Sequence, residues 1–306
     1  APLLPLGASS AFLTACSTAT PSTAKEYVAT SFTPMAAPSL ADAAAMATTT
    51  VGSTLNVHYG DNSVQSYRLA YQPFFITGQA VPDGKGGSII SGGYYDIHNK
   101  PIIDRSVAGK ERQFFSDSPD GTSLLALPDA KVANIKGKAV FGVVQFEYTT
   151  RDQAGAASGK NNAYGTLPSP IAVLTLDQDQ RTGKLSLVKY HNVDTSSVHG
   201  LWITCGASLS PWNTHLSSEE YEPDAQFISD SPFFKAFSKN LFGDENKANP
   251  YHYGHLPEVT VHPDGSGSIK KHFCLGRISH ELIQVMPDNR TVLTVSYTHL
   301  TLPTKA

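Results

Sequence analysis

The sequence predicts an all-β fold, and its composition and local patterns carry that prediction. Charged residues make up only 16% of the 306-residue chain, which also holds 24 glycines and 20 prolines. Short runs of β-branched and aromatic residues alternate with polar, glycine- and proline-containing turns. Such a pattern is typical of turn-rich β proteins and differs from that of helical bundles. We therefore expect consecutive hairpins along most of the chain.

The hairpins can be placed in order. Residues 139–148 form a long apolar run typical of a strand, and residues 216–249 read as an insertion with a short helix near Phe233 and Phe237. Four strand pairs flank clear turn signals, namely 54–59 with 64–69, 170–177 with 183–190, 258–261 with 268–273, and 281–286 with 291–293. Successive hairpins suggest blades of a β-propeller, whose radial closure leaves only short edges. No strict repeat is visible, so periodicity alone does not separate a propeller from a sandwich.

Composition also excludes several function classes. The net charge is −3 and the isoelectric point is near 6.4, so no basic surface points to nucleic acid. No apolar run reaches the length of a transmembrane helix. The three cysteines, Cys16, Cys205 and Cys274, are too few for a disulfide scaffold, and their odd number raises the question of what each thiol does alone.

Both ends of the chain differ from its middle. Residues 1–16 read as a signal peptide without its beginning, and Leu13-Thr14-Ala15-Cys16 resembles a bacterial lipobox. The alternative is an ordinary cleavage site with an incidental cysteine. Residues 17–50, rich in Ala, Ser, Thr and Pro, are typical of a flexible tether. Residues 295–306 resemble a translated sequencing adapter, the alternative being a genuine strand. This leaves residues 51–294 as the folded part.

Residues 201–220 are the most informative stretch of the chain. An apolar strand leads to Cys205, a small-residue turn follows, and the stretch ends on Glu219 and Glu220. One thiol and two carboxylates could supply one soft and two hard metal ligands. Without a metal, Cys205 would be a small buried hydrophobic residue and the two glutamates would be surface charges.

The same stretch closely resembles the cysteine motif of the PhoX-type alkaline phosphatases, calcium- and iron-dependent phosphomonoesterases of the bacterial cell envelope. Downstream, residues 275–281 read Leu-Gly-Arg-Ile-Ser-His-Glu and resemble the "LGRxxHE" segment of that family. The resemblance covers roughly residues 50–294. It implies a decorated, six-bladed β-propeller, of which this chain would be an incomplete N-terminal part.

The resemblance also implies roles for individual residues. Cys205 and Glu281 match iron ligands and are therefore the predicted catalytic residues, and at least one of Glu219 and Glu220 is expected to bind calcium. His280 is expected to support the site or to pack, and of the other histidines His199 and His215 are singled out because they flank the motif. Cys274 has no counterpart, and core packing is the expectation for it.

The implied function is a metal-dependent phosphomonoesterase that releases inorganic phosphate from small phosphate esters in the bacterial cell envelope. Iron and calcium would stabilise the developing charge and supply an oxo or hydroxo nucleophile, so no serine or histidine nucleophile is needed. We expect a monomer that meets a membrane only through a lipid at Cys16, and an inactive protein if the chain is truncated. Two alternatives remain: a non-catalytic envelope propeller that binds a ligand or partner, and a calcium-dependent, lactonase-like propeller without a thiolate ligand.

Overall fold

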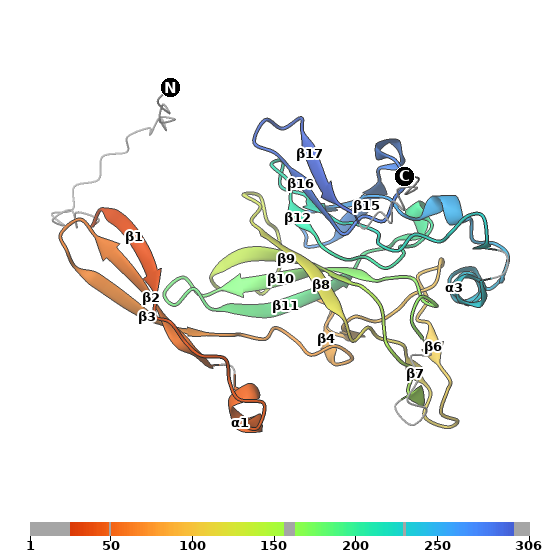
Figure 1. Ribbon diagram of the computed structural model, residues 1–306. Coiled ribbons are helices and arrows are strands. Elements are labelled where there is room, and N and C mark those ends of the chain that lie inside the picture. Colours follow the sequence, from red (N-terminus) through yellow and green to blue (C-terminus); the bar gives the residue numbers. More distant parts are fainter. Residues whose placement is uncertain (1–24, 49, 156–162, 229–230, 297–306) are drawn as a thin grey trace, which may run out of the picture. The chain divides into compact units, whose positions relative to one another are not determined.

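The computed structural model (Figure 1) describes residues 25–48, 50–155, 163–228 and 231–296. The predicted lipobox at Cys16 and nearly all of the predicted adapter tail lie outside these residues. The chain divides into two compact units, residues 1–72 and 73–306, which are described separately. None of the described helices is long and apolar enough to cross a membrane.

The first unit contains one three-stranded antiparallel sheet. Its strands are β1 (Tyr27–Phe32), β2 (Thr50–Tyr59) and β3 (Val64–Ala70), and the short helix α1 (Ala43–Met46) lies between β1 and β2 in the sequence. The predicted hairpin of β2 and β3 is confirmed. β1 and α1 lie inside the segment that composition predicts as a tether. The β-branched and aromatic run from Tyr27 to Phe32 explains why a strand forms there.

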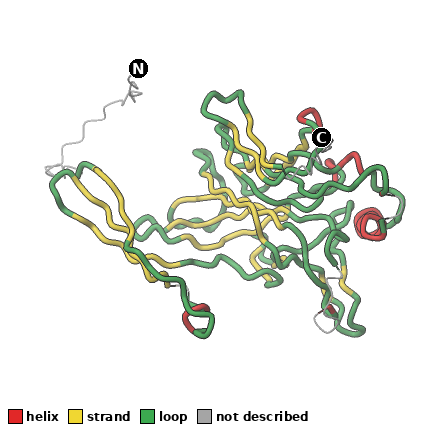
Figure 2. The backbone as a smooth tube through the Cα atoms, in the orientation of Figure 1, coloured by secondary structure: helices red, strands yellow, loops and turns green. Residues whose placement is uncertain are grey.

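The second unit is built from small antiparallel sheets joined by long loops (Figure 2). Two of its two-stranded sheets come first in the chain, and two four-stranded sheets and a further pair follow. The strands are β4 (Ala80–Pro82), β5 (Ser88–Ile90), β6 (Ile103–Asp104), β7 (Arg112–Gln113), β8 (Pro119–Leu125), β9 (Lys138–Phe146), β10 (Ile171–Gln178), β11 (Leu185–Asn192), β12 (Ser208–Leu209), β13 (His215–Leu216), β14 (Pro257–Val261), β15 (Gly267–Lys271), β16 (Leu282–Val285) and β17 (Val292–Val295).

The all-β prediction is therefore confirmed, and so are the predicted hairpins of β10 with β11, β14 with β15, and β16 with β17. A closed propeller is not seen in the described part of the chain, where the sheets remain small and separate. Each four-stranded sheet follows chain order, β8 to β11 and β12 to β15. The first strands of successive sheets lie together, because β12 contacts both β8 and β16.

The central sheet is buried on both faces. Val143 and Val173 point to one side and pack with Val259 of β14, so they join the two four-stranded sheets. Val144 and Leu174, one residue further along each strand, pack on the opposite side in a second cluster. This alternation is the period of two expected of a strand. It fixes the register of β9 and β10 and makes them a rigid support for the loops at their ends.

One helix of three turns stands out from the sheets. Helix α3 (Pro232–Phe242) begins at Ser231, whose hydroxyl accepts the Phe234 backbone N–H at 3.3 Å, and ends at Gly243 with φ of 77°. Its buried face includes Phe237 and packs against Trp202. The predicted short helix is thereby confirmed. Single 3-10 turns occur at η1 (Ser196–Val198), η3 (Pro250–His252) and η4 (Phe273–Leu275).

Candidate metal centre

Three side chains that can ligate a metal converge in the second unit. One ligand atom from each of Asp120, Glu147 and Cys205 lies within 4.8 Å of the other two. The Cys205 thiol donates to Asp120 Oδ2 at 3.6 Å. Asp120 lies at the start of β8, Glu147 follows β9 directly, and Cys205 lies in the loop before β12. The structure thus places the predicted ligand Cys205 among oxygen donors that are distant in the sequence.

Two further predicted residues belong to the same group. Glu220 is 3% exposed and shares a hydrogen bond with the Cys205 thiol. Glu281 directly precedes β16, and its charge raises the pKa values of Asp120, Glu147 and Glu220. We call Asp120, Glu147, Cys205, Glu220 and Glu281 the acidic cluster. Three of the four ligands predicted from the sequence lie in it, and their metal-binding role stays a prediction.

The acidic cluster brings like charges close together. Burial, followed by the charges of Asp120, Glu220 and Glu281, raises the pKa of Glu147 to about 7. Burial is also the largest cause of the raised pKa values of Asp120, Glu220 and the Cys205 thiol. Among the described residues, no lysine or arginine forms an ion pair with these carboxylates. A bound cation would remove the repulsion and favour the charged form of every member.

Glu219, the fourth predicted ligand, has a different environment. Its Oε1 accepts the Trp202 backbone N–H and Lys271 Nζ, each at 2.9 Å. Its Oε2 accepts the backbone N–H groups of Gly254 at 3.0 Å and His255 at 3.1 Å. Both members of the Glu219–Lys271 ion pair are fully buried. Four donors within the protein therefore use its carboxylate, which ties together the loops around the site.

The backbone holds Cys205 and Glu220 side by side. The Cys205 N–H donates to Ser218 O at 3.3 Å, and the Glu220 N–H donates to Ile203 O at 3.0 Å. Ile203 has φ of 35° and Tyr221 has φ of 49°, backbone angles that residues other than glycine rarely adopt. Strained residues of this kind concentrate at functional sites, where the surrounding structure enforces them. Here they flank the two predicted ligands, Cys205 and Glu220.

Two glycines allow the three segments to approach closely. A Cβ at Gly121 would lie 2.8 Å from Cys205 O, and a Cβ at Gly206 would lie 2.6 Å from Glu281 O. Ser218 Oγ lies 2.7 Å from both Gly206 O and Glu281 O. Any larger residue at either glycine would push the cysteine loop away from β8 or from the segment that carries Glu281.

His215 supports the loop that carries Cys205 through a chain of hydrogen bonds. Its Nδ1 lies 2.8 Å from Ser123 Oγ and its Nε2 lies 2.9 Å from Gln145 Oε1. Because an amide oxygen only accepts, Nε2 carries the hydrogen and Nδ1 accepts from the serine. The Gln145 amide in turn donates to the Cys205 carbonyl. Complete burial lowers the pKa of His215 to about 3, so the ring is neutral.

The other singled-out residues lie outside the acidic cluster. His199 is exposed and stacks on His252 with 3.9 Å between ring centroids. His280 is buried, as expected of a packing residue, and its Nδ1 lies 3.0 Å from Thr294 Oγ1. The core-packing prediction for Cys274 is wrong, because this cysteine is exposed in η4. Strand β15 ends at Lys271, before the chain reaches Cys274.

Asp120 and Glu147 are the members that sequence reasoning missed. Asp120 stands in a Ser-Pro-Asp-Gly run that reads as an ordinary turn, and Glu147 stands in the predicted strand 139–148. Nothing in their local sequence distinguishes them from surface carboxylates. Only the pairing of β8 with β9, and the contact of β12 with β8, brings them to Cys205.

Comparison with known proteins relates part of the chain to a family. Residues 177–298 match the family model of alkaline phosphatase PhoX. The match is consistent with a PhoX-type family member. The PhoX match includes Cys205, Glu220 and Glu281, whereas Asp120 and Glu147 lie before it. No curated protein and no solved structure matches the chain. The family suggests a hydrolase of the alkaline phosphatase type, and alkaline phosphatases are generally metal-dependent.

Proposed function

We propose that the protein is a metal-dependent phosphomonoesterase that releases inorganic phosphate from organic phosphate esters. The observation that carries the proposal is the acidic cluster, which brings one thiol and four carboxylates together. Three of its members, Cys205, Glu220 and Glu281, lie within the residues that match PhoX. A purely structural role explains the cluster poorly, because neighbouring carboxylates raise the pKa values of Asp120, Glu147 and Glu220, and no described lysine or arginine forms an ion pair with them. Metal binding explains both the composition and the charge.

The donor set fits the two metals that the family resemblance implies. A thiolate suits iron, and carboxylate oxygens suit both iron and calcium. Cys205 and Glu281 are the proposed iron ligands, and Glu220 is favoured over Glu219 for calcium because Glu219 is engaged by four protein donors. Asp120 and Glu147 are added to the proposed ligands. When bound, the metals would supply positive charge that stabilises the transferring phosphoryl group.

The protein's own groups would prepare that site. Cys205 would give up its thiol proton on metal binding, since the thiolate is the ligating form. The Glu219–Lys271 pair would fix the loop that carries Trp202, and the His215–Gln145 pair would fix the loop that carries Cys205. The four carboxylates would cancel part of the positive charge of the metals, and the phosphate would balance the rest.

We further propose that the sheets are blades of a β-propeller. Sheets of four antiparallel strands in chain order are the repeating unit of that fold. In a propeller the first strands of successive blades are neighbours around the central axis. The contacts of β12 with β8 and β16 support this arrangement. Asp120 on β8, Cys205 before β12 and Glu281 before β16 would then all face the central channel.

We also propose an envelope location, a monomeric state and small phosphate esters as substrates. The location is supported by Leu13-Thr14-Ala15-Cys16 together with the PhoX match. If Cys16 is lipidated, the acyl chains that it carries would hold the protein at the membrane. Cys16→Ser in the complete gene should then move the protein to the soluble fraction after cell fractionation, and unchanged membrane association would exclude lipidation there.

The function is tested by Cys205→Ser, with Cys274→Ser as the matched control. Serine replaces a soft thiolate by a weak neutral ligand, so the purified Cys205→Ser protein should lose most of its iron and most hydrolysis of phosphomonoesters. Exposed Cys274 should tolerate the same change without effect. Metal content is measured by elemental analysis, and the iron–thiolate absorption band should disappear with Cys205. Wild-type iron and activity in Cys205→Ser would refute the mechanism, and a metal-loaded protein without phosphatase activity would favour a binding propeller.

A further inference from the structure

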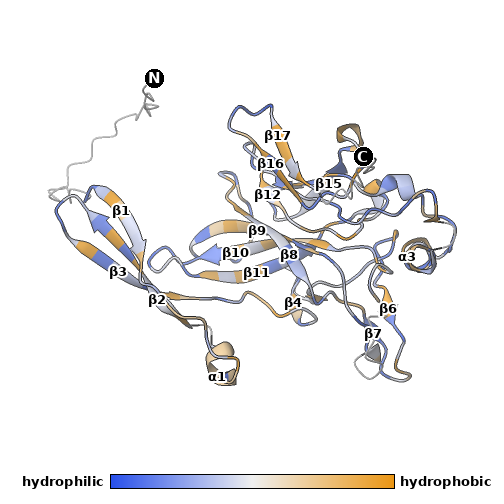
Figure 3. Cartoon of the chain, viewed as in Figure 1, coloured by the Kyte–Doolittle hydropathy of each residue, from blue (hydrophilic) through white to orange (hydrophobic). Residues whose placement is uncertain are grey.

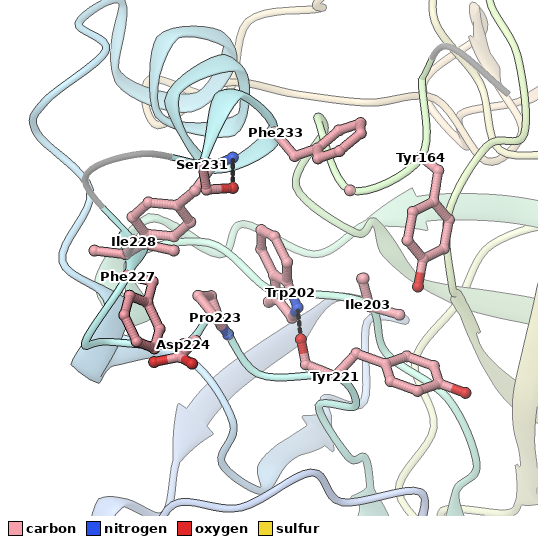
Figure 4. A pocket seen from close by; sticks show the side chains of 12 residues that line it. Tyr164, Trp202, Ile203, Tyr221, Pro223, Asp224, Phe227, Ile228, Ser231 and Phe233 are labelled. Carbon is pink, nitrogen blue, oxygen red and sulfur yellow. Dashed lines mark hydrogen bonds between the residues drawn. The ribbon is translucent and has the colours of Figure 1, made fainter.

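Beside the acidic cluster lies a cavity that the proposed reaction does not yet use. Its volume is about 280 Å³. In Figure 4, Phe227 and Tyr164 lie on opposite sides of Trp202, and the ring of Tyr221 extends toward the side of Tyr164. An engineered cavity of about 150 Å³ binds benzene, so this cavity has room for a one- or two-ring group. The aromatic side chains that line it are Tyr164, Trp202, Tyr221, Phe227, Phe233 and Phe234.

We propose that this aromatic cavity binds the alcohol part of the substrate and selects phosphate esters of aromatic or apolar alcohols. The inference rests on the proposed function, because it assigns the phosphate end of the same substrate to the acidic cluster. It goes beyond that function by naming the chemical class of the group released with phosphate.

The aromatic cavity and the acidic cluster share a wall. Tyr221 follows Glu220 in the chain, and the side chains of the two residues share a hydrogen bond. Ile203 lines the cavity two residues before Cys205. Tyr164 lies close enough to the cluster for the charges of Glu147 and Glu220 to act on it. A ring in the cavity could therefore carry a phosphate that reaches the cluster.

The charges of the lining fix the direction in which an ester would lie. In the described part of the chain, the lining contains no lysine, arginine or histidine, so it offers a phosphate dianion no cationic side chain. The exposed carboxylate of Asp224 lies beside Phe227 in Figure 4 and would repel an anion on that side. The phosphate would thus point away from Asp224, toward the metals bound at the acidic cluster.

The cavity is preformed at its base and open at its mouth. Trp202 Nε1 donates to Tyr221 O at 2.8 Å, and the indole packs on Phe237 with 4.9 Å between ring centroids. Phe227 and Phe233, by contrast, are 61% and 51% exposed. Exposed aromatic rings around a fixed base are typical of a binding site, because a ligand ring removes their surface from water.

The chain's two tryptophans allow a direct binding test. Trp202 lines the cavity and Trp212 does not, so Trp212→Phe leaves a protein whose tryptophan emission reports Trp202. In this metal-loaded background, we expect phenyl phosphate and phenol to change the emission on titration. Glycerol 2-phosphate and inorganic phosphate should leave it nearly unchanged, because they lack a ring to contact the indole.

Phe227→Ala and Phe233→Ala should each weaken phenol and phenyl phosphate binding by about 3- to 10-fold, the loss expected for one aromatic contact. Both should lower kcat/KM for phenyl phosphate to a similar extent and lower kcat/KM for glycerol 2-phosphate much less, because glycerol has no ring to contact them. Phe273→Ala removes an aromatic ring that is 46% exposed outside the lining, and it should change neither value.

The possible failures can be told apart. No Trp202 response to phenol and phenyl phosphate, or equal binding in the Phe227, Phe233 and Phe273 variants, would overturn the inference even in an active phosphatase. Phenol binding that both lining variants weaken, in a metal-loaded protein that hydrolyses neither ester, would overturn the proposed function and leave an aromatic binding site.

Discussion

At the residue scale, the two adjacent glutamates show what sequence reasoning could and could not supply. The motif predicted that Glu219 or Glu220 binds metal, without deciding between them. In extended backbone, neighbouring side chains point to opposite sides. Glu219 therefore meets Lys271 in the interior, while Glu220 meets the Cys205 thiol. The choice depends on the placement of Lys271 on β15, which no local pattern in the motif reveals.

Neutralising these two carboxylates should have opposite consequences. Glu219→Gln leaves the fully buried ammonium of Lys271 without a counter-charge, which typically costs about 3–5 kcal/mol of folding free energy. Glu220→Gln removes one of several repelling charges, so the metal-free protein should be no less stable while its metal content falls. Urea unfolding of chelator-treated protein and elemental analysis measure the two effects. Equal destabilisation by both changes would contradict this division of roles.

At the element scale, the strands were predictable where turn signals are local, and the long-range pairings were not. The hairpin of β10 and β11 turns through a loop in which Gly183 has φ of 73°, and such a glycine marks the turn in the sequence. The pairing of β8 with β9 spans a longer loop, in which Asn134 and not a glycine adopts the positive φ, of 66°. Asp120 and Glu147 owe their position to that pairing, which is why they escaped prediction.

His215 links β13 to β8 and β9, and this link should be sensitive to acid. Burial lowers its pKa from 6.5 to about 3. Between these two pH values, His215 is protonated in the unfolded chain and neutral in the folded protein. The stability that depends on the neutral ring is complete above pH 6.5 and is lost as the pH falls from there toward about 3. The loss should approach about 1.4 kcal/mol per pH unit within that window.

The comparison variant is His215→Gln, whose amide can replace both hydrogen bonds and does not titrate. Urea unfolding of the two proteins at a series of pH values, from above 6.5 downward, isolates the histidine, because every other titrating group is common to both. The difference between the free energies of unfolding of the wild-type protein and His215→Gln should shrink as the pH falls. A difference that stays constant with pH would show that His215 is already protonated in the folded protein or does not titrate in this range.

At the scale of the whole chain, the two units differ in how much apolar surface they bury. In Figure 3, β1 to β3 alternate between apolar and polar residues, a pattern that usually covers a core. Nevertheless every residue of β1 is exposed, as are nearly all residues of β3. In β9 and β10, by contrast, most residues are buried on both faces. The pattern of residues predicted β2 and β3, whereas β1 lies in the segment read as a tether, and the pattern could not predict how little this sheet buries.

This contrast should appear in amide hydrogen exchange of the intact chain. A three-stranded sheet without a covered apolar face has little to offset the conformational entropy of ordering it. The amides of β1, β2 and β3 should therefore exchange through local opening with a free energy near zero, whereas those of β9 and β10 should exchange only near the global unfolding free energy. Mass spectrometry of labelled peptides from the two units resolves them. Protection of β1 to β3 equal to that of β10 would show that their exposed faces are covered in solution.

Metal loading should slow exchange further at Cys205 and its neighbours. It should leave β1 to β3 unchanged, because all five members of the acidic cluster lie in the second unit.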